Sequence, residues 1–304
     1  MLAWVPSDLV AQALGDLDQI DIEVVDPDAG VDLPASAERV EFYVPPFFPR
    51  SGAVRALAGM PGLRVVQTMT AGVDLFRPQV PTGVLLCNAR GVHDASTAEW
   101  VVAAALAVRR EFPGFAAEQA AGRWSYRFTG ALAGSTVLIV GYGSIGAAVE
   151  RRLAGFEVTV QRVARTAREG VHPAADLPDL LPGADVVILL APVTAATIGM
   201  VDAAFLAAMK DGALLVNAAR GVLVRTDDLT AELASGRLAA ALDVTDPEPL
   251  PPGHPLWSLP NAFITPHIAA STGYSALAAV GFLRAQLERY RSGAPLANVI
   301  TGEY

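Results

Sequence analysis

Three side chains that carry charge or protons, Arg220, Glu248 and His267, each follow a short apolar run in the second half of the chain. Such runs are typical of buried parallel strands, whose carboxyl ends line the ligand crevice of an open α/β sheet. We therefore expect a guanidinium, a carboxylate and an imidazole to meet at one edge of a sheet. This combination suits hydride transfer to or from a 2-keto acid. The runs are residues 214–216, 239–244 and 262–264.

The composition indicates a globular protein of two domains. The chain has 304 residues, of which 52% are apolar and 17% charged, so it can bury a large interior. Its net charge of -9 argues against nucleic acid or an anionic membrane as a partner, since either requires a basic surface. The single cysteine, Cys87, excludes an internal disulfide and suits the reducing cytoplasm. We expect Cys87 to be a buried, apolar residue.

The order of elements predicts an α/β fold. Strand-like runs alternate with helix-like stretches at the start of the chain, and a second α/β unit covers about residues 134–268. Ser96 and Glu99 match a capping box, which predicts that a helix begins there. A helical pattern follows near the end of the chain, and no run is long enough to span a bilayer. The early strands are expected at residues 22–25, 40–44 and 63–67, and the late helix at 276–291.

A glycine-rich loop follows the strand-like residues 136–140 and precedes the helix-like residues 147–153. That context favours a dinucleotide-binding loop, in which a tight turn, close backbone approach and helix packing each require a glycine. The unpaired N–H groups at the start of the helix would bind the cofactor phosphates. The predicted cofactor-binding residues here are Gly141, Tyr142, Gly143, Ser144, Ile145 and Gly146.

The residues after the next predicted strand favour NADP(H) over NAD(H). Sites selective for NAD place an acid there to bind the ribose 2′-hydroxyl, but residues 158–168 contain none. They contain Arg162, Arg165 and Arg168 instead, and a guanidinium binds a 2′-phosphate well. We assign Arg162 and Arg165 to the cofactor. The alternative is that these arginines only coat an exposed turn.

Four segments, in this order and spacing, resemble the D-isomer-specific 2-hydroxyacid dehydrogenases, and in particular glyoxylate/hydroxypyruvate reductases. The resemblance spans roughly residues 60–285. It implies a Rossmann-type NAD(P)-binding domain at residues 94–269. It also implies a smaller, flavodoxin-like α/β substrate domain built from residues 1–93 and 270–304. The four segments are residues 140–146, 217–221, 243–249 and 265–269.

The resemblance also implies a role for each charged residue. Arg220 would bind the substrate carboxylate and polarise the keto oxygen, His267 would be the general acid/base, and Glu248 would orient His267. Asp243 would hold the nicotinamide carboxamide. The resemblance places further cofactor contacts at Thr97, Pro192 and Ala219, and substrate contacts at Ala71, Gly72 and Val73. The last three could equally form a plain strand-to-turn connection.

The expected reaction is the reduction of a small 2-keto acid, such as glyoxylate or hydroxypyruvate, to the D-2-hydroxy acid by a homodimer. Trp124 would lie at the dimer interface, near the partner's active site, or be buried in the core. Formate dehydrogenases carry glutamine where this chain has Glu248, which weighs against formate oxidation. Phosphite oxidation and a dinucleotide-sensing, corepressor-like protein remain alternatives. No metal site is expected, because His93, His172 and His254 lack partners at ligand spacing.

Overall fold

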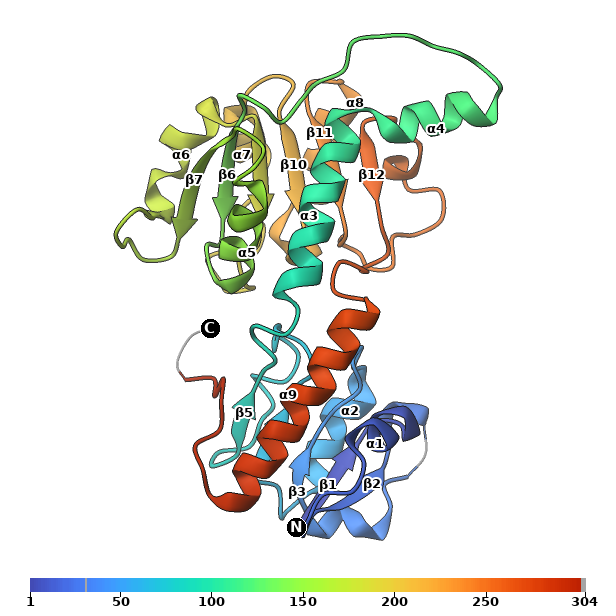
Figure 1. Ribbon diagram of the computed structural model, residues 1–304, viewed down its shortest axis with the longest axis vertical. Coiled ribbons are helices and arrows are strands. Elements are labelled where there is room, and N and C mark those ends of the chain that lie inside the picture. The colour runs from blue at the N-terminus through green and yellow to red at the C-terminus, as the bar shows by residue number, and fades with distance from the viewer. Residues whose placement is uncertain (31, 302–304) are drawn as a thin grey trace. The chain divides into compact units, whose positions relative to one another are not determined.

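The computed structural model describes residues 1–30 and 32–301, which form two compact units. The first unit contains residues 1–93 and the residues from Gly273 onward, and the second contains residues 94–272. Each unit is built on its own parallel sheet with helices around it (Figure 1). The expected α/β class is therefore confirmed.

The sheet of the first unit has five parallel strands in the order β2-β1-β3-β4-β5. This is the strand order of flavodoxin-like folds, as the sequence predicts. The predicted strand positions agree with the observed ones to within two residues. The strands are β1 (Leu2–Val5), β2 (Asp21–Val24), β3 (Val40–Tyr43), β4 (Val65–Gln67) and β5 (Leu85–Cys87).

Helices cover both faces of this five-stranded sheet. Because side chains alternate along a strand, neighbouring residues enter different cores. Ala3 and Phe42 pack with residues of α1 and α9, whereas Trp4 and Tyr43 pack with residues of α2. All four of these side chains are fully buried. The helices are α1 (Asp8–Leu14), α2 (Ser51–Arg55) and α9 (Gly273–Ser292).

Cys87, at the end of β5, is fully buried in the first unit, as expected. Burial raises the pKa of its thiol to about 11. Its backbone forms an antiparallel bridge with Val299. Nearby, the buried Gln286 of α9 donates to Gln67 Oε1 at 2.7 Å and accepts from the N–H of Ala297 at 2.9 Å. These contacts tie the last described residues to the sheet.

The sheet of the second unit has seven parallel strands in the order β12-β11-β10-β9-β6-β7-β8. Its strand order reverses between β6 and β9, as in Rossmann folds, where the ligand binds outside the carboxyl ends of the strands. The strands are β6 (Thr136–Val140), β7 (Thr159–Ala164), β8 (His172–Pro173), β9 (Val186–Leu189), β10 (Leu214–Asn217), β11 (Ala239–Leu242) and β12 (Ala262–Ile264).

Helices also cover both faces of the seven-stranded sheet (Figure 1). Leu138 and Val187 pack with residues of α6, α7 and α8, whereas their neighbours Val137 and Ile188 pack with residues of α3 and α5. Among the described residues, no helix is both long and apolar enough to cross a membrane. The helices are α3 (Asp94–Arg109), α5 (Ser144–Leu153), α6 (Leu177–Leu180), α7 (Ala203–Ala208) and α8 (Thr226–Ala234).

The predicted capping box at the start of α3 is wrong. The helix begins at Asp94, so Ser96 lies inside it. The hydroxyl of Ser96 is hydrogen-bonded to Thr272 Oγ1 at 2.6 Å, and Glu99 forms an ion pair with Arg152 at 3.5 Å. Because both side chains have these partners, neither closes the reciprocal bonds that define a capping box.

An arm follows α3. It consists of α4 (Phe112–Ala120) and residues 121–131, which have no regular secondary structure and lead into β6. Within the second unit, the arm reaches away from the sheet (Figure 1). No residue of α4 is buried.

Candidate active site

The three predicted catalytic residues lie beyond the carboxyl ends of adjacent strands. Arg220 follows β10, Glu248 follows β11 and His267 follows β12. Because these strands are parallel neighbours, their carboxyl ends lie at the same edge of the sheet. His267 is bonded to Glu248, and the charge of Arg220 acts on the Glu248 carboxyl. The structure therefore brings all three together.

His267 and Glu248 form a close pair. His267 Nδ1 lies 2.6 Å from Glu248 Oε1, and the two side chains are 34% and 41% exposed. Burial by itself would raise the pKa of Glu248. The hydrogen bond with His267 and the charges of His267 and Arg220 outweigh it, so the pKa of this carboxyl lies below its usual value. Glu248 is therefore a carboxylate at neutral pH, and it fixes the imidazole by its Nδ1 atom.

Arg220 stands on a turn that Asn217 holds in shape. The Asn217 side chain donates from Nδ2 to the carbonyl oxygen of Arg220 and accepts from the N–H of Ala219, each at 3.0 Å. The guanidinium of Arg220 donates from Nη1 to the carbonyl oxygen of Ala219 at 2.8 Å. The side chain is half-buried. These bonds keep the guanidinium close to the edge of the sheet.

The backbone at His267 is left-handed, with a φ of 54°, which is uncommon for a residue with a side chain. Its N–H donates to the carbonyl oxygen of Asp243 at 2.8 Å. The buried Asp243 carboxylate accepts from Thr265 Oγ1 at 2.6 Å and from the N–H groups of Ile268 and Ala269, each at 2.8 Å. A carboxylate has about four acceptor positions, so one remains for another donor. Asp243 thus shapes the turn that presents His267.

The glycine loop meets the geometric demands of a dinucleotide site. Gly141 has a φ of 102°, and a Cβ there would lie 2.3 Å from the backbone nitrogen of Ala191. A Cβ at Gly146 would lie 3.1 Å from the carbonyl oxygen of Gly141, so this glycine allows close packing of α5. At Gly143 a Cβ would meet no described atom within 4 Å. The space beside Gly143 therefore suits the approach of a ligand.

Helix α5 begins at Ser144, directly after Gly143 of this loop, and no side chain caps its N-terminus within the described residues. The N–H groups of the first turn, including that of Ile145, can therefore bind an anion. Ser144 Oγ donates to Asp94 Oδ1 at 3.1 Å, which joins the starts of α5 and α3. The open space at Gly143 and this helix end fit the pyrophosphate of NAD(P).

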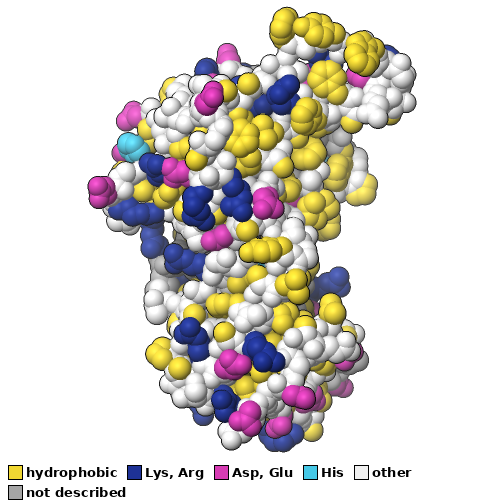
Figure 2. All heavy atoms as spheres, viewed as in Figure 1, with side chains coloured by type: hydrophobic (Ala, Val, Ile, Leu, Met, Phe, Trp, Pro, Cys, Tyr) yellow, Lys and Arg dark blue, Asp and Glu magenta, His cyan; other side chains and the backbone are white. Residues whose placement is uncertain are grey.

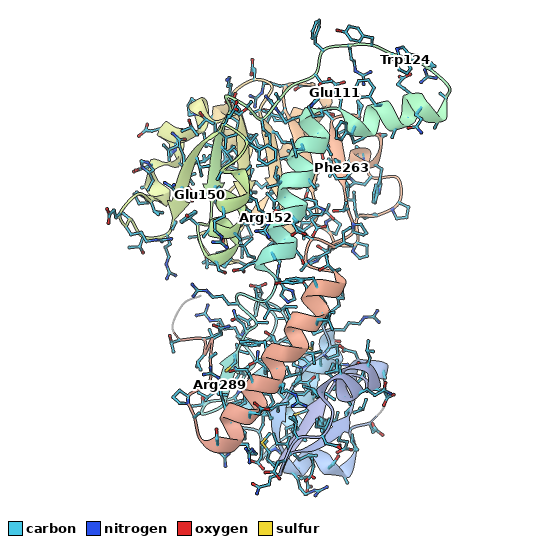
Figure 3. All side chains as sticks on the ribbon, in the orientation of Figure 1. Glu111, Trp124, Glu150, Arg152, Phe263 and Arg289 are labelled. Carbon is cyan, nitrogen blue, oxygen red and sulfur yellow. The ribbon has the colours of Figure 1, made fainter. Side chains whose placement is uncertain are left out.

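Arg162 lies inside β7 and forms a two-pronged ion pair with Glu150 of α5. Figure 3 labels Glu150 beside β6 and β7. The hydroxyl of Tyr142 donates to the same carboxylate. The bond from Arg162, followed by that from Tyr142, keeps the pKa of Glu150 below its usual value despite some burial.

Arg165 and Arg168 follow the end of β7, and both are exposed. Arg168 donates from Nη2 to the carbonyl oxygen of Tyr142 in the glycine loop. The turn after β7 therefore carries two arginines, one of which already contacts that loop.

The remaining predicted cofactor residues also lie in the second unit. Pro192 follows β9 and is exposed, and Ala219 follows β10 and is buried. Both lie beyond the carboxyl ends of their strands, at the same edge as the glycine loop. Thr97 is buried near the start of α3, which packs against α5.

The predicted substrate residues Ala71, Gly72 and Val73 belong to the first unit and follow β4. Thr70 Oγ1 donates to the carbonyl oxygen of Gly72 at 2.8 Å, and Asn88 Nδ2 donates to that of Ala71 at 2.7 Å. No described residue accepts a hydrogen bond from the N–H of Gly72 or Val73. These two donors can bind an acceptor from a ligand.

The other three histidines have structural contacts. His93 is buried and its Nε2 lies 2.7 Å from the carbonyl oxygen of Met69. His172 lies 3.0 Å from Asp176, and His254 accepts from the N–H of Leu256. Within the described ranges 1–30 and 32–301, no group of three or more His, Cys, Asp or Glu side chains could hold a metal ion.

Three residues that shape the site were given no role from the sequence: Glu150, Asp94 and Gly221. A regular strand-to-helix pattern does not indicate which acid of α5 faces β7, or that Ser144 reaches Asp94. Gly221 directly follows Arg220 in the segment 217–221, and a glycine can mark a place where another part of the backbone approaches closely. That signal could have identified Gly221.

The fold and the site define a dinucleotide-binding α/β oxidoreductase. Residues 102–269 match the family model described as "D-isomer specific 2-hydroxyacid dehydrogenase, NAD binding domain". The chain belongs to the D-isomer specific 2-hydroxyacid dehydrogenase family, so it is an NAD(P)-dependent oxidoreductase.

Named relatives and solved structures agree with this family. A glyoxylate reductase/hydroxypyruvate reductase from Mus musculus is 38% identical over 226 residues, covering 69% of this chain and 68% of that protein. A glyoxylate reductase from Thermofilum pendens is 35% identical over 227 residues, covering 70% and 67%. A family member from Xanthobacter autotrophicus, solved with NADPH and MES, has a TM-score of 0.83 at 29% identity, covering 99% and 97%. An NADPH-dependent glyoxylate/hydroxypyruvate reductase from Sinorhizobium meliloti, solved with NADP and sulfate, has a TM-score of 0.82 at 29% identity, covering 98% and 96%.

Proposed function

We propose that this protein reduces a small 2-keto acid, of the glyoxylate or hydroxypyruvate kind, to the D-2-hydroxy acid with NADPH. The observation that carries the proposal is the His267–Glu248 pair beside Arg220, at the sheet edge that also carries the glycine loop. Relatives at moderate identity carry the names glyoxylate reductase and hydroxypyruvate reductase.

His267 is the proposed general acid. Glu248 binds its Nδ1 atom, so Nε2 is the ring nitrogen that would give a proton to the keto oxygen. The carboxylate also stabilises the charged imidazolium before that proton leaves. When bound, the cofactor supplies the hydride for the keto carbon. In the reverse direction the same imidazole would accept the proton of the hydroxyl group.

Arg220 is the proposed ligand of the substrate carboxylate. Its guanidinium presents parallel N–H donors that match a carboxylate, and its charge would polarise the keto oxygen. The assignment of Ala71, Gly72 and Val73 to the substrate carboxylate stays a prediction from the family resemblance. It is supported by the N–H groups of Gly72 and Val73, which have no acceptor among the described residues.

The proposed preference for NADPH rests on the end of β7. In NAD-selective sites an acid binds the ribose 2′-hydroxyl there, but this strand ends at Ala164 and Arg165 follows. A guanidinium attracts a 2′-phosphate and a carboxylate repels it. We keep Asp243 as the proposed ligand of the nicotinamide carboxamide, with Thr97, Pro192 and Ala219 as further contacts.

The proposed assembly is a homodimer that uses the arm. Trp124, Tyr126 and Phe128 are 98%, 82% and 90% exposed. Figure 2 shows hydrophobic side chains gathered at the arm. Three neighbouring large apolar side chains in water favour burial against a partner. A second copy of the chain is the proposed partner, and Trp124 lies well away from its own sheet (Figure 3).

Contacts within the arm support this proposal. The residues between the aromatic ones hold the segment to α4: Arg123 and Ser125 bond to Glu118 at 2.5 and 3.1 Å. Arg127 bonds to Glu111 at 2.6 Å, and its guanidinium lies 3.9 Å from the ring centroid of Phe115. The side chains at positions 123, 125 and 127 therefore hold the segment to α4, and the aromatic side chains at positions 124, 126 and 128 stay exposed.

A turnover assay tests the proposed function. The protein would be incubated with glyoxylate, hydroxypyruvate, pyruvate and larger 2-keto acids, each with NADPH and with NADH, and cofactor oxidation would be followed by absorbance. We expect turnover with the small acids and a higher kcat/KM with NADPH. Cofactor binding without turnover of any acid would instead support a dinucleotide-sensing protein. Higher kcat/KM with NADH would overturn only the cofactor preference.

A further inference from the structure

The side chain of Tyr142, in the glycine loop, belongs to a network with Glu150 and Arg162. Its hydroxyl donates to Glu150 Oε2, and Arg162 donates to the same oxygen from Nε at 2.8 Å and to Oε1 from Nη2. The side chains of Arg162 and Glu150 are 33% and 22% exposed. A two-pronged pair that is partly shielded from water holds its geometry better than an exposed single contact.

Arg162 also contacts the turn formed by residues 168–171. Its Nη1 donates to the carbonyl oxygen of Gly170 at 3.4 Å. Two backbone bonds between Arg168 and Val171, at 3.2 and 2.8 Å, close this turn. One guanidinium therefore joins the phosphate-binding helix α5 to the turn that carries Arg168.

Arg168 rests on Tyr142. Its Nη2 donates to the carbonyl oxygen of Tyr142, and its guanidinium carbon lies 5.7 Å from the centroid of the tyrosine ring. The guanidinium of Arg162 lies at the same distance from that ring. Both distances are within the roughly 6 Å over which an aromatic ring attracts a cation. The ring and the carbonyl oxygen thus support Arg168 at the edge of the glycine loop.

The two arginines differ in their charge partners. Glu150 balances the charge of Arg162, and the hydrogen bond between them is the main cause of the lowered pKa of Glu150. Arg168 forms no ion pair with any described residue. Arg162 would have to leave Glu150 before it could bind a phosphate, whereas Arg168 can bind one where it stands.

We propose that Tyr142, Glu150 and Arg162 are positioning residues. They hold Arg168 and its turn so that the Arg168 guanidinium can bind the adenosine 2′-phosphate of the cofactor. This inference rests on the proposed use of NADPH. It changes the part played by Arg162, from a phosphate ligand to the support of the turn. Arg165 keeps its assignment to the phosphate.

The effect of removing the Glu150 carboxylate distinguishes the positioning proposal from a purely electrostatic explanation. If only charge mattered, removal of a carboxylate near a phosphate site would strengthen NADPH binding. If Glu150 positions Arg162 and the turn, its removal weakens recognition of the 2′-phosphate instead. The two explanations therefore predict opposite signs for the same substitution.

The experiment measures binding of 2′,5′-ADP and of 5′-AMP to the full chain by calorimetry. These probes differ in the 2′-phosphate, so the ratio of their Kd values isolates its recognition. The test variants are Arg168→Gln, Glu150→Gln and Arg162→Gln. Glu169→Gln, which removes an acid from the same turn, and Arg151→Gln, on the exposed side of α5, are matched controls. Binding of 5′-AMP at wild-type affinity shows that each variant is folded.

We expect the preference of each test variant for 2′,5′-ADP over 5′-AMP to fall about tenfold, which is the effect of one charge-assisted hydrogen bond. The two controls should keep this preference within about twofold of wild type and should leave kcat with saturating cofactor unchanged. A preference for 2′,5′-ADP in Glu150→Gln that equals or exceeds that of wild type would overturn the positioning network. An unchanged ratio in Arg168→Gln would overturn its phosphate contact. A wild-type protein that does not prefer 2′,5′-ADP would instead overturn the proposed NADPH preference, and this inference with it.

Discussion

Gly221 faces the carbonyl oxygen of Thr245 so closely that a Cβ at this glycine would lie 1.9 Å from it. Gly221 follows Arg220, and Thr245 belongs to the loop that carries Glu248. The loops after β10 and β11 therefore touch through their backbones. This contact sets the spacing between the loop that carries the Arg220 guanidinium and the loop that carries the Glu248 carboxylate, which is bonded to His267.

Gly221→Ala should damage both stability and activity. The added methyl group meets backbone atoms, which cannot rotate away, so one loop must shift at a cost of about 1–3 kcal/mol or more. Urea unfolding and kcat/KM for the keto acid would measure the two effects. Gly155→Ala, where a Cβ meets no described atom, is the matched control and should change neither. A Gly221→Ala variant with wild-type activity would show that this spacing is unimportant.

Gly143→Ala should separate cofactor binding from folding. Its Cβ meets no described atom within 4 Å, so the unfolding transition should stay close to wild type. The methyl group would occupy the space proposed for the pyrophosphate, so the Kd for NADPH should rise by about tenfold or more. Gly141→Ala should instead prevent stable folding, because its Cβ would overlap Ala191. Unchanged NADPH affinity in Gly143→Ala would place the pyrophosphate elsewhere.

His267→Ala should lower kcat by about 100-fold or more, the usual contribution of a general acid. The Kd for NADPH should stay nearly unchanged, because the imidazole is assigned to the substrate and not to the cofactor. Steady-state kinetics and fluorescence titration would measure the two quantities. His172→Ala, which removes an exposed histidine paired with Asp176, is the control. Near wild-type turnover in His267→Ala would remove His267 from the mechanism.

Glu248→Gln should change the pH profile of reduction. If His267 is the general acid, reduction is lost as pH rises and the imidazolium loses its proton, and the variant lacks the carboxylate that favours the imidazolium. The alkaline fall in kcat/KM should therefore move to lower pH. Because the pKa of Glu248 is lowered, the wild-type carboxylate keeps its charge down to a pH below the ordinary range for glutamate. An identical alkaline limb in the variant would mean that Glu248 does not act on His267.

Substitution of the arm should change the oligomeric state. Replacing Trp124, Tyr126 and Phe128 by serine removes the exposed aromatic surface but keeps Arg123, Ser125 and Arg127, which hold the segment to α4. We expect wild type to sediment as a dimer and the triple variant to shift toward monomer. Leu9→Ser, an exposed apolar residue of α1, is the control. A wild-type monomer would contradict the proposed homodimer.

The sequence predicts the parts of the site that follow directly from strand ends. Arg220, Glu248 and His267 lie where the apolar runs place them, because parallel strands must end at one edge. The glycine loop was also predictable. The positive φ of Gly141 and its close backbone contacts leave no space for a side chain, so a glycine is required there. These features depend on local geometry, which a sequence pattern records.

Features that depend on side-chain direction were not predictable. The pattern of α5 does not reveal that Glu150 would bind Arg162, so the assignment of Arg162 to the cofactor could not take this ion pair into account. The start of α3 was misplaced because Ser96 and Glu99 match a capping box in type and spacing. Their observed partners, Thr272 and Arg152, lie far away in the sequence.

The burial of Cys87 allows the opening of the first unit to be measured by thiol labelling. The protein has a single thiol, which is fully buried and has a pKa raised to about 11, so a thiol reagent can react only when β5 becomes exposed. The labelling rate at neutral pH therefore reports how often that unit opens, with no background from another cysteine. A ligand that binds the first unit would slow the labelling, and its affinity could be read from a reaction that involves none of the candidate catalytic residues.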